Sequence, residues 1–280
     1  VPFIEHLGEG FCSRFKEYLL TNDSSLIRRV LGAAHFYATR WEFGIIERCN
    51  PSGFAIDEIR EDLDSRFSKY RTLPCMQTLL GNHKLMLFLD IVAQLRFQMR
   101  WSHVPRVPKT SVLGHMLIVG VLSYLASLKA GLDATRCCNN YITGLFHDLP
   151  EVLTRDVISP VKNAVSGLDD IIRRYEREEM DKKIYNLLPG EIERKMRQLI
   201  TDEFSDLCPK ENGIQRDGRL VKAMDDLAAY LEVFLASENG MRNHVFETAR
   251  VTLLDKYKNV QIVGMNIGEM YADFDTRAYS

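Results

Sequence analysis

The sequence lacks the marks of a disulfide-stabilised protein and of a membrane-spanning one. Six of its 280 residues are cysteine, and no two of them form a CxxC pair. The adjacent Cys137 and Cys138 are poorly placed to bridge each other, so we expect free thiols in a reducing cytoplasm. No uninterrupted apolar run reaches about 18 residues, and we therefore expect no membrane span.

An excess of either charge is also missing. The 36 basic and 38 acidic residues leave a formal net charge of -2, with a pI of about 6.4. Proteins that bind duplex DNA or RNA more often have a basic balance or a basic stripe, and neither is evident here. The composition argues against nucleic acid as the main partner. It is typical of a globular protein that needs no disulfide or metal to fold.

Alternating strand patterns and flexible linkers are absent, whereas helical periodicity covers nearly the whole chain. Helices are expected at about residues 24–48, 56–70, 75–99, 112–129, 134–147, 168–187, 191–201, 219–238 and 241–257. We predict an all-α protein with three parts. These are a helical extension (1–96) packed on the core, a functional domain (97–258) and a C-terminal tail (259–280) that contains the only β-like stretch. An apolar stripe near residue 90 is expected to face the core or a second subunit in a homodimer.

Several ionisable side chains stand inside apolar helices. His115 lies early in one such helix, His147-Asp148 closes the next, and Asp225 lies within a third. Burying these groups costs on the order of several kcal/mol unless they are paired or coordinate a cation. Two imidazoles and two carboxylates suit one borderline divalent metal, such as Mn, Co, Fe, Ni or Zn. Four protein ligands on a six-coordinate ion leave positions for water and substrate, as metal-assisted hydrolysis requires.

The stretch TGLFHDLPEVLTRDVISPVK, residues 143–162, is expected to end one helix and start another. Pro150 disfavours helical geometry at the residue before it and has no N–H for the helical ladder. The apolar helix should therefore end near Asp148, with Pro150 as the first residue of a new short helix. The break should keep the acidic residues that follow, Glu151 and Asp156, from stacking along the same helix as His147.

The order of these residues resembles the HD-domain phosphohydrolases, and more closely their bacterial 5′-deoxynucleotidase branch. A lone His-Asp pair occurs throughout a broad superfamily, but HDxxEVLTxD followed by SPVK, with an upstream Arg-Trp, is much more specific. The matching segments lie between about residues 100 and 235, and they are Arg100-Trp101, His115, His147-Asp148, Glu151, Asp156, Pro160-Val161-Lys162 and LVKAMDDLAAYL. The resemblance implies an HD-domain helical bundle with an additional N-terminal extension.

The resemblance also implies a role for each matching residue. The metal ligands would be His115, His147, Asp148 and Asp225. Glu151 would assist the attacking water, and Asp156 would lie near the sugar. Arg100 would hold the phosphate, and Trp101 would pack against the nucleoside sugar.

Plainer interpretations stay open for some of these residues. Arg100-Trp101 could anchor a helix end, and Asp156 could cap a short helix. Lys162 could be a phosphate neighbour or a solvated charge. Asp226, next to the expected ligand, could form an ordinary surface ion pair one turn away.

The chain departs from the family pattern at Gly114, where an acidic residue usually precedes the first histidine, and in its N-terminal extension. Both departures leave the substrate open. No histidine lies between His147 and His244, which favours one metal over two, although a second ion held by carboxylates such as Glu151 stays open.

We therefore predict a metal-dependent phosphomonoesterase that acts on (deoxy)nucleoside 5′-monophosphates. One alternative is an HD phosphohydrolase acting on a triphosphate, cyclic or modified nucleotide, and another is a nucleotide-binding regulatory module. A triphosphate pocket would need more basic residues than stand near the motif. The presence of all four ligands and Glu151 argues against a degenerate site.

Overall fold

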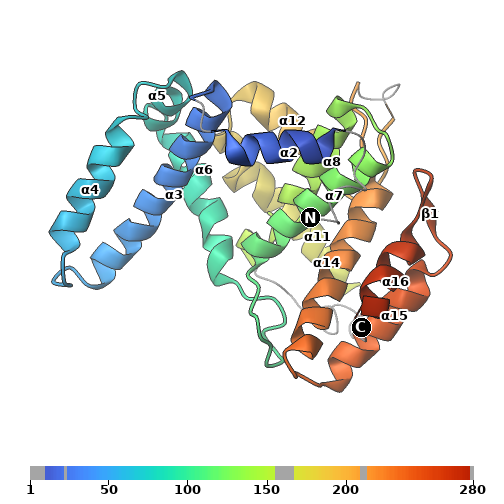
Figure 1. The fold of residues 1–280 in the computed structure, drawn as a ribbon. Coiled ribbons are helices and arrows are strands. Elements are labelled where there is room, and N and C mark those ends of the chain that lie inside the picture. Colours follow the sequence, from blue (N-terminus) through green and yellow to red (C-terminus); the bar gives the residue numbers. More distant parts are fainter. Residues whose placement is uncertain (1–9, 22–23, 155–166, 209–212, 278–280) are drawn as a thin grey trace. The chain divides into compact units, whose positions relative to one another are not determined.

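The computed structural model describes residues 10–21, 24–154, 167–208 and 213–277, whose regular elements are nearly all helices (Figure 1). The elements are α2 (Phe11–Leu20), α3 (Leu26–Cys49), α4 (Ile56–Ser68), α5 (Pro74–Leu80), α6 (His83–Gln94), η1 (Leu95–Phe97), α7 (Val112–Lys129), α8 (Ala134–Phe146), α9 (Glu151–Thr154), α11 (Leu168–Lys183), η2 (Tyr185–Leu187), α12 (Gly190–Ile200), α14 (Gly218–Glu238), α15 (His244–Tyr257), β1 (Gln261–Ile262), β2 (Met265–Asn266) and α16 (Ile267–Arg277). The all-α prediction is confirmed.

The chain divides into two compact units, one of residues 10–87 and one that includes the described chain from residue 88 onward. The division falls within α6, and the predicted domain boundary after residue 96 stays a prediction. The packing of the N-terminal extension on the functional domain stays a prediction.

The N-terminal unit is built around the helix pair α3 and α4. Ala33 on α3 and Phe67 on α4 are buried together with Leu73 and Met76, which follow in the chain. Helix α3 starts where the Ser25 hydroxyl accepts a hydrogen bond from the backbone N–H three residues on. That contact satisfies one of the donors left over at a helix N-terminus.

The single long helix expected over residues 75–99 is wrong, because the structure has two helices there. Asn82 lies between α5 and α6, and its Oδ1 accepts from the backbone N–H groups of Lys84 and Leu85 at 3.1 and 3.3 Å. An asparagine that caps a first turn begins a new helix instead of continuing the old one. Apolar periodicity does not register such a cap, because both helices carry apolar faces.

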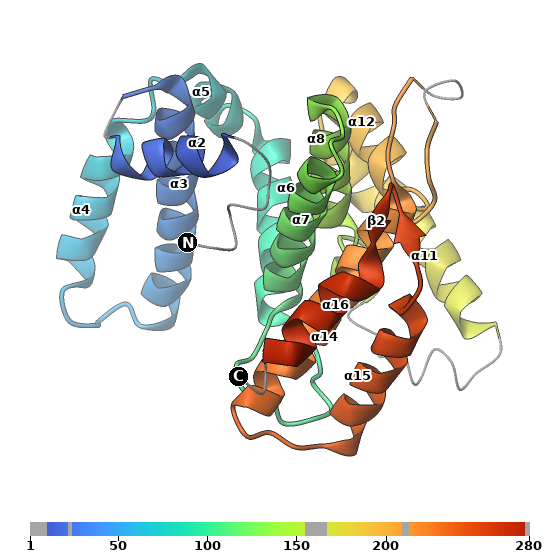
Figure 2. The same ribbon diagram turned by 45° about the vertical axis from the view of Figure 1, so that its right-hand side comes forward.

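Helices α7, α8 and α14 pack on one another at the centre of the second unit (Figures 1 and 2). Glycines line the contact between α7 and α8. A Cβ on Gly144 would lie 3.0 Å from the Val119 carbonyl oxygen and 3.1 Å from the Gly120 Cα. Residues without a Cβ let the two backbones approach, and this brings the start of α7 close to the end of α8.

Helix α7 is long and apolar enough to cross a membrane by length and composition alone, with a hydropathy of 1.6 over its 18 residues. Its apolar residues do not form an uninterrupted run, because polar side chains such as Ser123 and Ser127 lie among them. Both hydroxyls are buried in the structure. The core helix of a globular protein meets the same test, and α7 packs against α8 and α14.

A buried polar network fixes the start of α14 against the other two central helices. Asp217 precedes α14, and its Oδ2 accepts from Arg136 Nε at 2.6 Å and from Asn140 Nδ2 at 2.9 Å. The Asn140 Oδ1 accepts from the Asp217 backbone N–H at 2.8 Å, and Asn140 also bonds Ser127 on α7. The network sets the register of α14 and therefore the position of Asp225 two turns further along.

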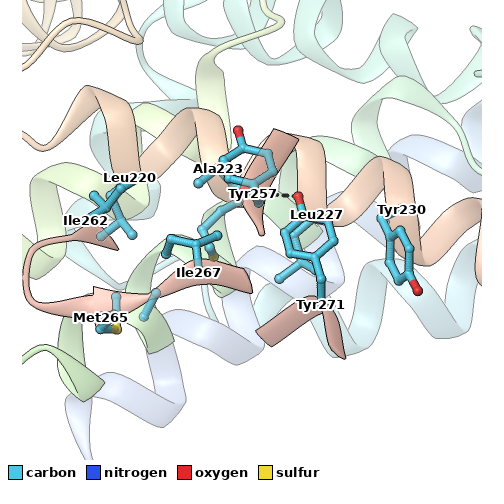
Figure 3. Close-up of a cluster of buried hydrophobic side chains, with 11 residues drawn as sticks. Leu220, Ala223, Leu227, Tyr230, Tyr257, Ile262, Met265, Ile267 and Tyr271 are labelled. Carbon is cyan, nitrogen blue, oxygen red and sulfur yellow. Dashed lines mark hydrogen bonds between the residues drawn. The ribbon is translucent and has the colours of Figure 1, made fainter. Parts of the chain in front are cut away.

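The C-terminal segment packs into the core, so the expected tail is a folded element from residue 261 to 277. Strands β1 and β2 pair antiparallel, and Gly264 has a φ of 79° in the turn between them. Figure 3 shows Ile267 and Tyr271 among the buried side chains of α14 and α15. The Tyr271 ring stacks on Tyr257 with 5.2 Å between centroids.

Candidate metal centre

The His-Asp pair lies where α8 ends. The last residue of α8 is Phe146, and His147 keeps helical φ and ψ beyond it. The Glu151 backbone N–H then donates to the Asp148 carbonyl at 3.0 Å, and α9 begins at Glu151. The predicted break near Asp148 is confirmed, although Pro150 stands one residue before the new helix instead of being its first residue.

The four side chains predicted as metal ligands come together in the structure. His115 Nε2 on α7 lies 2.9 Å from Asp225 Oδ1 on α14 and 3.8 Å from Asp148 Oδ2. His147 Nε2 lies 3.1 Å from Asp148 Oδ2 and 3.6 Å from Asp225 Oδ1. Ligand atoms that share one ion at about 2.0–2.2 Å stand about 3–4 Å apart. These four separations are close to that range.

Both imidazoles turn the same nitrogen toward the carboxylates. His147 Nδ1 lies 2.8 Å from the Gly144 carbonyl, which can only accept, so Nδ1 carries a proton. The opposite atom, His147 Nε2, is buried and faces the carboxylates of Asp148 and Asp225. A buried imidazole nitrogen facing two carboxylates has the donor chemistry of a divalent metal site. The residues present therefore fit the metal that the sequence predicts.

The charges at this site depend on one another. Burial lowers the pKa of His147, but Asp148 and Asp225 outweigh it and raise that pKa well above its ordinary value. Burial raises the pKa of Asp148, but His147 more than offsets this and lowers the pKa to about 2. The pKa of Asp225 is also well below its ordinary value, because hydrogen bonds from His115 and His147 outweigh its burial. Both carboxylates are ionised at neutral pH, so the site favours a cation.

Arg100 and Trp101 lie in the loop between η1 and α7, so the helix-end interpretation is wrong. The Arg100 backbone N–H donates to the Thr110 carbonyl at 3.0 Å, and Trp101 has a left-handed φ of 57°. Arg100 Nη1 lies 3.7 Å from Asp148 Oδ2. Burial favours neutral Arg100, but the Glu232 and Asp148 carboxylates outweigh it and raise the pKa of the guanidinium. The guanidinium therefore stays charged beside the ligands.

One buried acidic residue at this site, Glu232 on α14, was not predicted from the sequence. Its Oε1 lies 3.3 Å from His115 Nδ1, and its Oε2 accepts from Trp101 Nε1 at 2.7 Å. Burial raises the pKa of Glu232, but the contacts with His115 and Arg100 outweigh it and lower the pKa. The signal that could have found it is spacing, because it stands seven residues after Asp225 and so on the same face of the helix.

Comparison with known protein families agrees with this geometry. The family model described as HD domain matches residues 92–261, more than half of the chain. The chain belongs to the HD domain family. The resemblance noted from the sequence is confirmed, and all four predicted ligands lie within the matched residues of the HD domain.

Individual relatives of this HD domain place it near the 5′-deoxynucleotidase branch. A 5′-deoxynucleotidase of Shewanella oneidensis is 27% identical over 168 residues, which are 58% of this chain and 79% of that protein. A dATP triphosphohydrolase of an Acinetobacter phage is 35% identical over 82 residues, 26% of this chain and 40% of that protein. A solved HD-domain phosphohydrolase from Listeria innocua is 16% identical, with a TM-score of 0.50. It covers 69% of this chain and 97% of its own, and the likeness shows the fold.

Asp226 contacts residues other than the two histidines of the predicted ligand set. Its Oδ2 accepts from the Tyr257 hydroxyl at 2.7 Å, away from the histidines. Lys222 Nζ lies 3.0 Å from Asp226 Oδ1 and 2.7 Å from Asp225 Oδ2. The ion pair expected for Asp226 is present, but Asp226 is buried and not on the surface.

The remaining predicted residues follow the His-Asp pair. Glu151 is half-buried, and its backbone carbonyl accepts from Gln98 Nε2 at 3.3 Å. Asp156 and Lys162 lie outside the described residues. Their predicted roles, and that of Glu151, stay predictions.

Proposed function

We propose that this HD-domain protein is a cytoplasmic, metal-dependent phosphohydrolase that removes phosphate from (deoxy)nucleoside 5′-monophosphates. The observation that carries the proposal is the meeting of two imidazole Nε2 atoms and two ionised carboxylates beside a buried, charged guanidinium. The family match and the 5′-deoxynucleotidase relatives support the same conclusion.

One divalent transition metal would be held by His115, His147, Asp148 and Asp225. When bound, the metal would polarise a phosphoryl oxygen and make water a stronger nucleophile at neutral pH. The protein sets up this site in advance, because both imidazoles already present Nε2 to the carboxylates. The acidic residues keep their charge at neutral pH and so compensate that of the cation.

Arg100 would hold the phosphate. A guanidinium matches the oxygens of a phosphate in its planar geometry, and it keeps its charge when buried. Arg100 reaches the ligands through Nη1, 3.7 Å from Asp148 Oδ2, while its Nε is directed at Glu232 at 3.3 Å. The guanidinium is thus held by two carboxylates at a distance from which it can contact a phosphate beside the ligand cluster.

Glu151 would orient water for in-line attack and accept its proton. It begins α9 directly after the turn that carries Asp148, and Gln98 holds its backbone. A general base needs this kind of fixed position beside the reacting group. Asp156 and Lys162 would contact the sugar and the phosphate, and Trp101 would pack against the nucleoside.

Hydrolysis of a nucleoside triphosphate is the second candidate, because a dATP triphosphohydrolase matches part of the chain. A triphosphate would require further cations near the ligands. Among the described residues, the cations that contact the proposed ligand carboxylates are Arg100 and Lys222. The monophosphate therefore fits the observed charges better.

The decisive experiment is a hydrolysis panel. Metal-free protein is reconstituted with Mn, Co, Fe, Ni or Zn, and phosphate release is measured from nucleoside mono-, di- and triphosphates. We expect release of inorganic phosphate from 5′-monophosphates with at least one metal. Release of tripolyphosphate from dATP would favour the second candidate. Nucleotide binding without hydrolysis under any metal would favour a regulatory module.

A further inference from the structure

Glu232 contacts both a predicted metal ligand and the residues predicted to bind the substrate. It lies on α14, seven residues after Asp225, and is only 2% exposed. A buried carboxylate costs on the order of several kcal/mol unless donors or cations surround it. Its partners therefore explain why an acidic residue stands at this position in the core.

The two carboxylate oxygens of Glu232 face different partners. Oε1 lies 3.3 Å from His115 Nδ1, the ring nitrogen opposite to the one that faces Asp225. Oε2 accepts from Trp101 Nε1 at 2.7 Å and from Arg100 Nε at 3.3 Å. One oxygen thus contacts a predicted metal ligand. The other contacts Arg100 and Trp101, the two residues predicted to bind the substrate, which we call the substrate arm.

The Oε1 contact selects the tautomer of His115. A carboxylate can only accept, so the proton of the imidazole belongs on Nδ1 when that atom faces Glu232. Nε2 then has its lone pair free for a cation beside Asp225. Carboxylates that hold a ligand histidine in this way fix the ring orientation.

The Oε2 contacts hold the substrate arm in place. Trp101 has a left-handed φ of 57° that few residues with a side chain adopt, and such strain persists only when surrounding contacts hold it. The indole N–H bond to Glu232 and the edge-on packing of Trp101 against Phe246, with 5.5 Å between centroids, are such contacts. Arg106 lies in the same loop as Trp101, and its Nη1 donates to the backbone carbonyl of Glu232 at 3.0 Å.

We infer that Glu232 is a positioning residue that couples the metal ligand His115 to the phosphate-holding arm of Arg100 and Trp101. The inference rests on the proposed function, since it assigns Glu232 to the same site. An apolar residue in this place would fill the core equally well. It would, however, leave the Trp101 Nε1 proton and the Arg100 guanidinium without the carboxylate that they contact, so packing alone does not account for a carboxylate.

The test compares Glu232→Gln with Glu238→Gln, the same change at an exposed position on the same helix. Zn²⁺ and Co²⁺ affinities of the metal-free proteins are measured by calorimetry, and KM and kcat are then measured at saturating metal. We expect Glu232→Gln to weaken metal binding about 10- to 100-fold and to raise KM several-fold. Glu238→Gln should keep both within twofold.

A third variant, Arg100→Lys, separates the effect on substrate binding from the effect on metal binding. It should raise KM while keeping metal affinity within twofold, whereas Glu232→Gln should change both. Metal affinity of Glu232→Gln within twofold of the wild type overturns the inference. A wild-type protein that binds no divalent metal overturns the proposed function itself, and the inference with it.

A measurement on the wild type keeps the inference testable even where Glu232→Gln does not fold. Nitrogen-15 NMR of the metal-free protein at mildly alkaline pH reports which nitrogen of the neutral imidazole carries the proton. We expect His115 to be protonated at Nδ1 and not at Nε2. A His115 protonated at Nε2 in the metal-free protein contradicts the role of Glu232.

Discussion

Asp225 and Asp226 are neighbours on α14, yet their carboxylates serve different parts of the protein. Asp225 Oδ1 lies 2.9 Å from His115 Nε2, whereas Asp226 Oδ2 accepts from the Tyr257 hydroxyl at 2.7 Å. Successive residues of a helix point about 100° apart. One carboxylate therefore faces the histidines, and the next faces α15.

This division predicts opposite effects for two matched substitutions. Asp225→Asn removes a negative charge that holds the proposed metal, so metal affinity should fall more than 100-fold while the protein stays folded. Asp226→Asn weakens the contacts to Tyr257 and Lys222, so it should lower the free energy of unfolding by about 1–3 kcal/mol. Its metal affinity should stay within a few-fold of the wild type. Calorimetric titration and urea denaturation of both variants check this, and a loss of metal binding in Asp226→Asn alone would reverse the ligand assignment.

Glu151→Ala should keep the metal and lose turnover. Glu151 begins α9 just beyond the turn that carries the ligand Asp148, and it is proposed to act on water. Removing a positioned general base typically costs about 10²- to 10⁴-fold in rate. Metal content by elemental analysis and kcat on a nucleoside monophosphate give the two readouts. An unchanged kcat would remove Glu151 from the mechanism.

A chain that ends at Lys258 should no longer fold cooperatively in the second unit, which begins at residue 88. Residues 261–277 bury Ile267 and Tyr271 against α14 and α15, and removing them would expose Tyr257 and Leu227. Losing a buried aromatic side chain typically costs about 3–5 kcal/mol, and this truncation removes several buried groups at once. Thermal unfolding followed by circular dichroism gives the answer. A truncated protein that melts at the wild-type temperature would mean that the segment is dispensable.

Two adjacent thiols should differ sharply in reactivity. Cys137 is 1% exposed, and burial raises the pKa of its thiol, whereas Cys138 is exposed. Thiolate is the reactive form, so a raised pKa reduces alkylation at any pH below it. At pH 8, iodoacetamide should modify Cys138 in the folded protein and reach Cys137 only after denaturation. Peptide mass spectrometry distinguishes the two, and equal labelling in the folded state would contradict the burial of Cys137.

The local part of the site could be predicted from the sequence, because its signals are short-range. Pro150 ends the ligand helix through its own backbone chemistry, and His147-Asp148 stand next to each other in the chain. The apolar setting of His115 and Asp225 indicated that they needed partners. Each of these signals lies within a turn or two of the residue that it concerns, although Pro150 stands one residue before α9 instead of being its first residue.

Contacts between residues that are far apart in the chain could not be predicted in this way. Glu232 contacts Arg100 across 132 positions in the chain, and nothing near either residue specifies the other. The core position of residues 261–277 likewise depends on a hairpin that returns the chain to α14. Its strands are two residues each, too short for an alternating pattern to appear. Such contacts follow from how the helices pack, which a single sequence does not show.

Gly144 supports both the packing of α8 and the orientation of a ligand, so Gly144→Ala should affect stability and metal binding together. The new Cβ would lie 3.0 Å from both Ser123 Oγ and the Val119 carbonyl oxygen, closer than ordinary van der Waals contact. The helices must separate slightly, which typically costs about 1–3 kcal/mol. The carbonyl of the same residue accepts from His147 Nδ1 at 2.8 Å, so the shift also moves the imidazole.

Gly190→Ala provides the matched control for this change, because a Cβ at Gly190 in α12 meets no atom within 4 Å. Urea denaturation should show a loss of stability in Gly144→Ala alone, and calorimetry should show weaker Zn²⁺ binding in the same variant. Equal stability of the two variants would contradict the close approach of α7 and α8. A destabilised Gly144→Ala protein with wild-type metal affinity would instead show that His147 keeps its position when the helices move apart.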